Sequence, residues 1–176
     1  MKNLIIICFA GSKTNGSLSG EEIRRLKKVT EDLKTGVLGR FIGPKNTTIY
    51  CGNNEEEDHV LQETLRILNP KDSFSLGGKN FTIRKIKYLS RRDSGRSASK
   101  QSYFVNEHLK RVYFSKKKIL PEIVLMNEDG MKKIINHLTN GPGYSCPEKF
   151  ISGEIPVGTV VKIKLPQKEI EAVIID

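Results

Sequence analysis

A turn of small polar residues, Gly11-Ser12-Lys13-Thr14, follows an apolar run over residues 4–10. The N–H groups and hydroxyls of such a turn, together with the Lys13 ammonium, could donate hydrogen bonds to a phosphate group. The turn is not a P-loop, because the Gly-x-x-x-x-Gly-Lys-Ser/Thr spacing is absent. In open α/β sheets ligands bind where buried strands end, so we expect any ligand near residues 9–16.

A second group of cations lies between residues 84 and 118. This segment holds twelve Lys and Arg residues against Asp93 and Glu107, so it carries the whole net charge of +10. Arg91, Arg92 and Arg96 lie in a long polar loop, from which they could reach a phosphate or bind a polyanion such as nucleic acid. No RNA- or DNA-binding motif accompanies them, so charge alone supports that partner.

The three histidines have neither metal-ligand nor catalytic spacing. His59 and His137 fall within predicted helices, and His108, in a helix predicted over residues 102–114, is interpreted as a structural or surface residue. We predict no metal and no cofactor.

The three cysteines lack Cys-x-x-Cys spacing and cannot all pair. We therefore expect reduced thiols in a cytoplasmic protein. No apolar run approaches a membrane span, so no membrane contact is predicted. The cysteines are Cys8, Cys51 and Cys146.

Strands and helices alternate along the chain. An apolar run of residues 4–8 predicts a buried strand, and Ser19 with Glu22 forms a capping box that starts a helix reaching residue 36. Further strands are expected at 47–51, 81–89 and 121–126, further helices at 55–68, 102–114 and 131–140, and a closing β-hairpin at 157–164 and 169–175. This order predicts an α/β fold in one domain, residues 1–176. Three layers, α/β/α, would enclose a mostly parallel sheet with a C-terminal hairpin.

The order of elements resembles the histidine phosphatase (phosphoglycerate mutase-like) superfamily, most specifically over residues 4–34 and 121–140. In that family the first strand ends in Arg-His-Gly, and a polar loop then leads to an amphipathic helix. The corresponding tripeptide here is Phe9-Ala10-Gly11, and the helix starts at Leu18-Ser19-Gly20-Glu21-Glu22. The resemblance implies that Ala10 stands at the nucleophilic histidine and Phe9 at the first phosphate-binding arginine.

Two further family positions are also replaced. The second phosphate-binding arginine corresponds to Glu56 or to Val60, depending on the register, and the second catalytic histidine to Asn127 or Glu128. A histidine phosphatase needs an imidazole nucleophile and a cationic pocket that stabilises the transferred phosphoryl group. The resemblance therefore implies a degenerate pocket with no catalytic residue. Its members would be Phe9, Ala10, Gly11, Ser12, Lys13, Glu56, Asn127 and Glu128.

Carboxylates stand where two predicted helices begin, at residues 55–58 and at Glu128-Asp129. Helix N-termini favour negative charge, so these residues fit ordinary capping and compensation of the helix dipole. They also fit a second interpretation, in which the crevice is acidic and receives a cation, an amine or a basic side chain of a partner.

Three functions follow as hypotheses. The preferred one is a catalytically degenerate histidine-phosphatase-like protein with a binding or regulatory role in the cytoplasm, its partner a phosphorylated small molecule or a protein. The second is a phosphomonoesterase or phosphoryl-binding enzyme whose rebuilt site uses Lys13. The third is a polyanion binder acting through residues 84–118.

Overall fold

The computed structural model describes residues 2–11, 14, 16–35, 48–52, 59–68, 82–86, 89, 103–111, 122–147, 153–165 and 167–173. The elements are β1 (Lys2–Ala10), α1 (Gly20–Thr35), β2 (Thr48–Cys51), α2 (His59–Leu68), β3 (Thr82–Lys85), β4 (Glu122–Asn127), α4 (Glu128–Asn140), β5 (Val160–Leu165) and β6 (Glu169–Val173). A further helix occupies residues 103–111. No helix in these ranges is long and apolar enough to cross a membrane.

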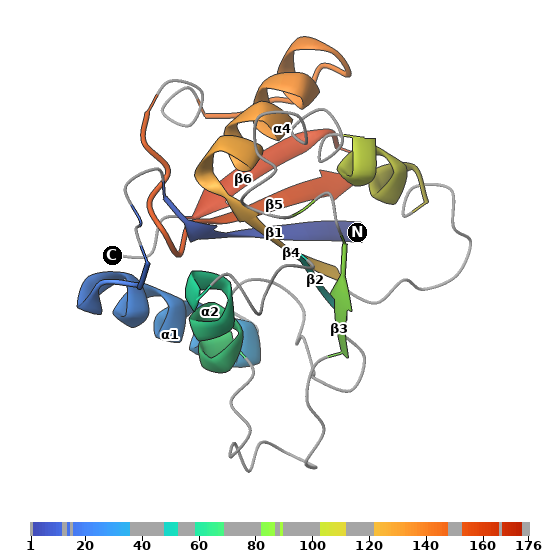
Figure 1. Cartoon of the computed structure of the whole chain (residues 1–176). Helices are drawn as coiled ribbons and strands as arrows, with labels where there is room; N and C mark the ends of the chain where they lie inside the picture. Colours follow the sequence, from blue (N-terminus) through green and yellow to red (C-terminus); the bar gives the residue numbers. More distant parts are fainter. Residues whose placement is uncertain are drawn as a thin grey trace.

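One six-stranded sheet organises these elements, in the order β3-β2-β4-β1-β5-β6 (Figure 1). Strands β3, β2, β4 and β1 are parallel, whereas β5 runs antiparallel to both β1 and β6. Strand β1 lies inside the sheet, between β4 and β5. The prediction of a mostly parallel sheet that ends in a C-terminal hairpin is therefore confirmed.

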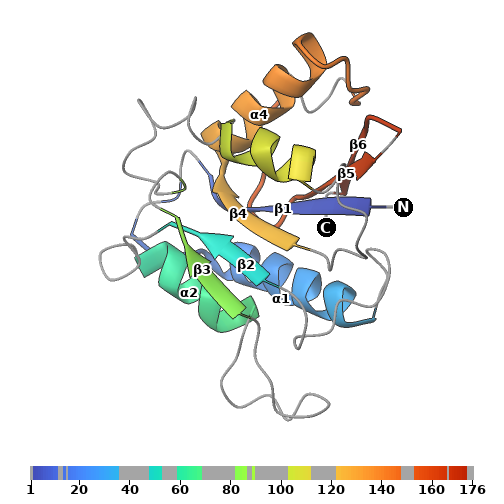
Figure 2. The ribbon, with the colours of Figure 1, turned by 90° about the vertical axis from the view of Figure 1, so that its right-hand side faces the viewer.

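Helices cover both faces of this sheet. Ile5 and Ile7 of β1 pack in a buried cluster with residues of α1 and α2, whereas Leu4 and Ile6 pack in a second cluster with residues of α4 and of the helix at 103–111. Successive side chains of a strand point to opposite faces, so the unbroken apolar run of β1 supplies both cores. Figure 2 shows the sheet between these two helical layers, as the three-layer prediction requires.

The predicted capping box starts α1. The backbone N–H of Ser19 donates to Glu22 Oε2 at 2.7 Å, and the N–H of Glu22 donates back to Ser19 Oγ at 3.3 Å. These two bonds satisfy donors that the first helical turn leaves unpaired. Within the helix Leu26, Val29 and Leu33 are buried against the sheet, at the predicted spacing.

Several boundaries differ from those expected. Strand β1 continues two residues past Cys8 to Ala10, through a shift in its pairing with β4 between these residues. Helix α4 starts at Glu128, where the predicted carboxylates stand, three residues before the first apolar position at 131, because Asn127 caps it. Strand β3 ends at Lys85, whereas a strand to residue 89 was expected.

Candidate functional site

The carboxyl ends of β1 and β4 lie side by side, with Ala10 paired to Asn127. On the other side of β1, the turn before β5 closes on Cys8. The Gly158 N–H donates to the Cys8 carbonyl at 2.9 Å, and the Cys8 N–H donates to the Thr159 carbonyl at 3.0 Å. The polar groups gathered at this edge are called the strand-end site. They are Gly11, Thr14, Glu22, Asn127 and Glu128.

Phe9 and Ala10 lie beneath this site and not on its surface. Both side chains are 0% exposed, and both belong to the core cluster that includes α1 and α2 residues. The strand continues through both residues, so the core takes up the two side chains that the sequence placed in the pocket. Neither is open to a ligand in this structure.

Thr14 holds the start of the turn together. The Gly11 N–H donates to Thr14 Oγ1 at 3.0 Å, and the Thr14 hydroxyl donates to Glu22 Oε1 at 2.9 Å. A hydroxyl has one proton to donate, and here Glu22 receives it. Thr14 was a predicted phosphate donor, but in this structure its proton and the Gly11 N–H are both used within the site.

Asn127 acts as the N-cap of α4. Its Oδ1 accepts a hydrogen bond from the Gly130 N–H at 2.9 Å, and the residue is 7% exposed. This is the ordinary role of an asparagine at a helix start. Asn127 was predicted in the degenerate pocket and was not identified as a helix cap.

Glu128 is the most buried charge of the site, at 4% exposure. Its Oε1 accepts a hydrogen bond from the Ile155 N–H at 3.1 Å and pairs with Lys132 Nζ at 2.7 Å. A Cβ built on Gly11 would lie 3.7 Å from Glu128 Oε2, so the carboxylate lies directly beside the end of β1. Burial, and secondarily the Glu128 charge, raises the pKa of the neighbouring Cys8 thiol.

Two of the described cations near this edge have acidic partners. Lys132 pairs with Glu128, and Arg25, which lies against Gly158, pairs with Glu21 at 2.5 Å. The histidines are elsewhere, at the first residue of α2, on the helix at 103–111 and in the last turn of α4. No group of three or more metal-ligating side chains occurs among the described residues.

The remaining predicted residues lie outside the described ranges. They are Ser12, Lys13, Glu56, Arg91, Arg92 and Arg96. The structure describes four of the twelve cations in the basic segment, residues 84–118. Arg84 and Lys85 are exposed on β3, Lys110 pairs with Glu107 at 2.9 Å, and Arg111 pairs with Glu122 at 2.7 Å.

Three contributors to the site were missed from the sequence. Glu22 was interpreted only as part of a capping box, yet its second oxygen holds Thr14. Lys132 stands four residues after Glu128, a spacing that predicts an ion pair on one helical face. The Ile155 N–H comes from a distant segment, and no local pattern could have indicated it.

A separate hollow of about 490 Å³ lies on the outer face of α1. It shares none of its described lining residues with the strand-end site. Its side chains are mostly charged and follow one helical stripe, as expected for a solvated face. The described lining residues are Gly20, Ile23, Arg24, Lys27, Lys28 and Glu31.

No protein-family model and no curated protein sequence matches this chain. Solved structures do. Phosphoglycerate mutase from Plasmodium falciparum aligns with a TM-score of 0.55 at 13% identity, over 99% of this chain and 89% of the other. Phosphoserine phosphatase from Entamoeba histolytica aligns at 0.54 and 12%, over 98% and 95%, and a mycobacterial glucosyl-3-phosphoglycerate phosphatase at 0.54 and 9%, over 92% and 89%.

These neighbours confirm the predicted phosphoglycerate mutase-like fold. The likeness extends over nearly the whole of each aligned chain, so it concerns the complete architecture and not one motif. At identities of 9–13% it establishes the fold alone.

Proposed function

We propose that this chain, which has the fold of the histidine phosphatases and phosphoglycerate mutases, is a catalytically degenerate protein of that fold with a binding or regulatory role in the cytoplasm. Its ligand or protein partner would bind at the carboxyl edge of the sheet, where proteins of this architecture place their sites. It would not hydrolyse phosphomonoesters through a phosphohistidine.

The observation that carries this proposal is the buried carboxylate of Glu128 at the end of β1. A phosphoryl-transfer site needs fixed positive charge where negative charge develops. Glu128 supplies the opposite sign beside Gly11. A phosphate placed there would meet a carboxylate that is already paired with Lys132, and not the fixed positive charge that phosphoryl transfer needs.

The residues that stand at the predicted catalytic and phosphate-binding positions of the family also support degeneracy. Ala10 offers no nucleophile, Phe9 is packed into the core, and Asn127 is occupied as a helix cap. None of these side chains can form a phosphoenzyme at nitrogen or hold a phosphoryl oxygen by charge.

A phosphoryl-binding enzyme with a rebuilt site is the second candidate. It is favoured by the solved neighbours, whose structures include a phosphatase with inorganic phosphate, another with 3-phosphoglyceric acid, and a His-to-Ala variant of the latter with phosphoserine. In this candidate Ser12 and Lys13 would bind the phosphate, and Arg91, Arg92 or Arg96 would add charge.

One pair of measurements separates the two candidates. Thermal unfolding is followed with phosphate and with orthovanadate, each against chloride at matched ionic strength, and turnover of p-nitrophenyl phosphate is followed in parallel. A ligand that binds only the native state stabilises it by RT ln(1 + [L]/Kd), so millimolar affinity is detectable at tens of millimolar ligand. We expect neither a shift nor turnover.

The second candidate predicts a shift that disappears in Lys13→Ala and persists in the control Lys27→Ala, on the outer face of α1. Turnover that also disappears in Lys13→Ala would overturn degeneracy. A shift without turnover would keep degeneracy but identify a phosphorylated small molecule as the ligand class.

Polyanion binding through residues 84–118 is a third possibility, supported by the charge of that segment. Its signature is counterion release, so affinity for single-stranded nucleic acid would fall steeply with salt. An undetectable or salt-insensitive interaction would remove it.

A further inference from the structure

The hollow of about 490 Å³ on the outer face of α1 has an elongated lining. Its described residues follow one another at a spacing of three, four or one from Gly20 to Glu31, so they form a single stripe of the helix surface. At a rise of about 1.5 Å per residue, this stripe is about 16 Å long. It lies on the side of the sheet away from α4 (Figure 1).

The charge of this stripe is unbalanced. Three cations, Arg24, Lys27 and Lys28, stand against one carboxylate, that of Glu31, and all three cations are exposed. Positions i, i+3 and i+4 bring side chains next to one another on a helix. Like charges at this spacing are unfavourable in the free protein. Anionic groups lying among these cations would relieve the repulsion.

Other cations of α1 are paired within the helix. Arg25 and Lys28 each pair with a carboxylate four residues away, and Lys28 does so at 3.2 Å. No such ion pair joins Arg24 or Lys27 to any residue that the structure describes. A face that has only to be solvated gains from pairs at i, i+4, as the neighbouring positions of the helix show. Arg24 and Lys27 are therefore the cations of this helix that remain open to another molecule.

The beginning of the stripe is apolar and open. Ile23 is partly buried and packs against the core cluster that includes α1 and α2 residues. A Cβ built on Gly20 would meet no atom within 4 Å. The stripe thus offers an apolar contact in its first turn and positive charge in the turns that follow. This pattern fits a partner that is apolar at one end and acidic beyond it.

We propose that the outer face of α1 is a docking surface for an extended acidic segment of a protein partner. An extended chain rises about 3.3 Å per residue, so about five residues span the stripe. Alternate side chains of that chain point to one side, about 6.6 Å apart. One apolar side chain followed by two carboxylates at alternate positions therefore matches Ile23 and the cations at Arg24, Lys27 and Lys28.

A peptide fits this face better than a free phosphate does. The three cations are spread along an exposed helix and do not converge on one point. Linked carboxylates contact them together, and linked contacts bind more tightly than separate ones. Phosphate is therefore expected to bind too weakly here to displace the peptide. The surface shares no described residue with the strand-end site, so its test is independent of catalytic degeneracy.

The test is a titration of the nitrogen-15-labelled protein with the blocked pentapeptide Leu-Thr-Glu-Thr-Glu at low salt, followed by amide chemical shifts. We expect the shifts to concentrate on residues 20–31. In the double variant Arg24→Gln/Lys27→Gln the Kd should rise about fivefold, as for the loss of two exposed ion pairs. The matched control Arg84→Gln/Lys133→Gln removes the same charge from exposed cations of β3 and α4, and should raise the Kd less than twofold.

Three results would overturn the proposal. Equal losses in the two double variants would mean that net charge alone attracts the peptide. Shifts concentrated on the strand-end site instead of on residues 20–31 would place the peptide elsewhere. Loss of peptide binding in tens of millimolar phosphate, but not in chloride at matched ionic strength, would identify a site for a small anion. A peptide with glutamine in place of glutamate should not bind, and equal binding of that peptide would also contradict the role of the cations.

Discussion

Two carboxylates lie at opposite ends of strand β4, and they are held by different kinds of partner. Glu128, just after the strand, is held by a backbone N–H and by a lysine one helical turn away. Glu122, at the start of the strand, is held by side chains from β2 and from the helix at 103–111. The partners of Glu128 satisfy a polar group at one edge of the sheet, whereas the partners of Glu122 join β2 and β4 to the helix at 103–111.

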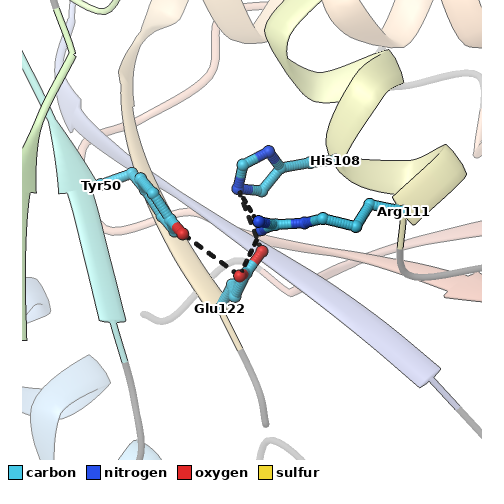
Figure 3. Close-up of polar contacts among 4 residues, drawn as sticks. All are labelled: Tyr50, His108, Arg111 and Glu122. Carbon is cyan, nitrogen blue, oxygen red and sulfur yellow. Dashed lines mark hydrogen bonds and ion pairs between the residues drawn. The ribbon is translucent and has the colours of Figure 1, made fainter. Parts of the chain in front are cut away.

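This difference shows where the structure retains chemical freedom. At the strand-end site the polar groups bond to each other or to backbone, and the side chains at the two family positions of β1 are packed in the core. At the start of β4, the Nε2 of His108 faces both Glu122 Oε2 and Arg111 Nη2, each at 3.1 Å (Figure 3). The described polar groups at the carboxyl ends of β1 and β4 are already paired, and His108 lies at the opposite end of β4.

The largest expected effect concerns the closure of the strand-end site. Phe9→Ala removes a fully buried aromatic ring, so we expect urea unfolding to show a loss of about 3–5 kcal/mol. If Phe9 instead lined an open pocket, the loss would be below about 1 kcal/mol, and the site would not be closed.

The control is Tyr103→Ala, because Tyr103 is an aromatic residue that is 65% exposed. A surface substitution of this kind changes stability by about 0.5 kcal/mol or less. Where Phe9→Ala is too unstable to measure, Phe9→Leu keeps the site apolar and should cost about 1 kcal/mol.

The architecture could be predicted because its signals are local. The unbroken apolar run of β1 required burial on both faces, and Ser19 with Glu22 marked a helix start that the structure confirms. The order of the strands was not predicted, since no single-element pattern determines which strands pair. The end of β1 was predicted less well, because the strand was expected to stop at Cys8, with Phe9 and Ala10 in the pocket, whereas it continues to Ala10.

The polar sites were harder to predict, for a physical reason. The N-cap role of Asn127 was missed, although capping involves neighbours in sequence and an asparagine before a helix is a local signal. Tyr50, His108 and Glu122 meet although Tyr50 and Glu122 are 72 residues apart, and side chains that meet through tertiary packing leave no periodic pattern in the sequence. The interpretation of His108 as structural agrees with its burial, but its partners could not have been named.

A smaller effect is expected where the turn before β5 meets α1. Gly158 has φ +89°, and a Cβ at this position would lie 2.8 Å from the Arg25 Cβ. Gly158→Ala therefore combines strain with overpacking, and we expect a loss of about 2–3 kcal/mol in urea unfolding. Gly16→Ala is the matched control, because Gly16 has φ +73° but no atom within 4 Å of the added Cβ. It should cost about 1 kcal/mol from strain alone. Similar losses in both variants would mean that the turn yields, and that this side of the strand-end site is not rigid.

The smallest perturbation is chemical labelling, which leaves the sequence unchanged. Burial raises the pKa of Cys51 to about 11, so about one thiol in a thousand is ionised at pH 8, and burial raises the pKa of Cys8 as well. Cys146 is only half-buried, although burial also raises its pKa.

Iodoacetamide followed by peptide mass spectrometry should therefore modify Cys146 first in the native protein, and Cys8 and Cys51 only as the protein opens. Urea-unfolded protein provides the reference in which all three thiols react alike. Cys8 reports on the strand-end site, because it lies at the end of β1 where the turn before β5 closes. Labelling of Cys8 as fast as Cys146 would show that this edge opens readily, and would restore the possibility that a ligand reaches the positions of Phe9 and Ala10.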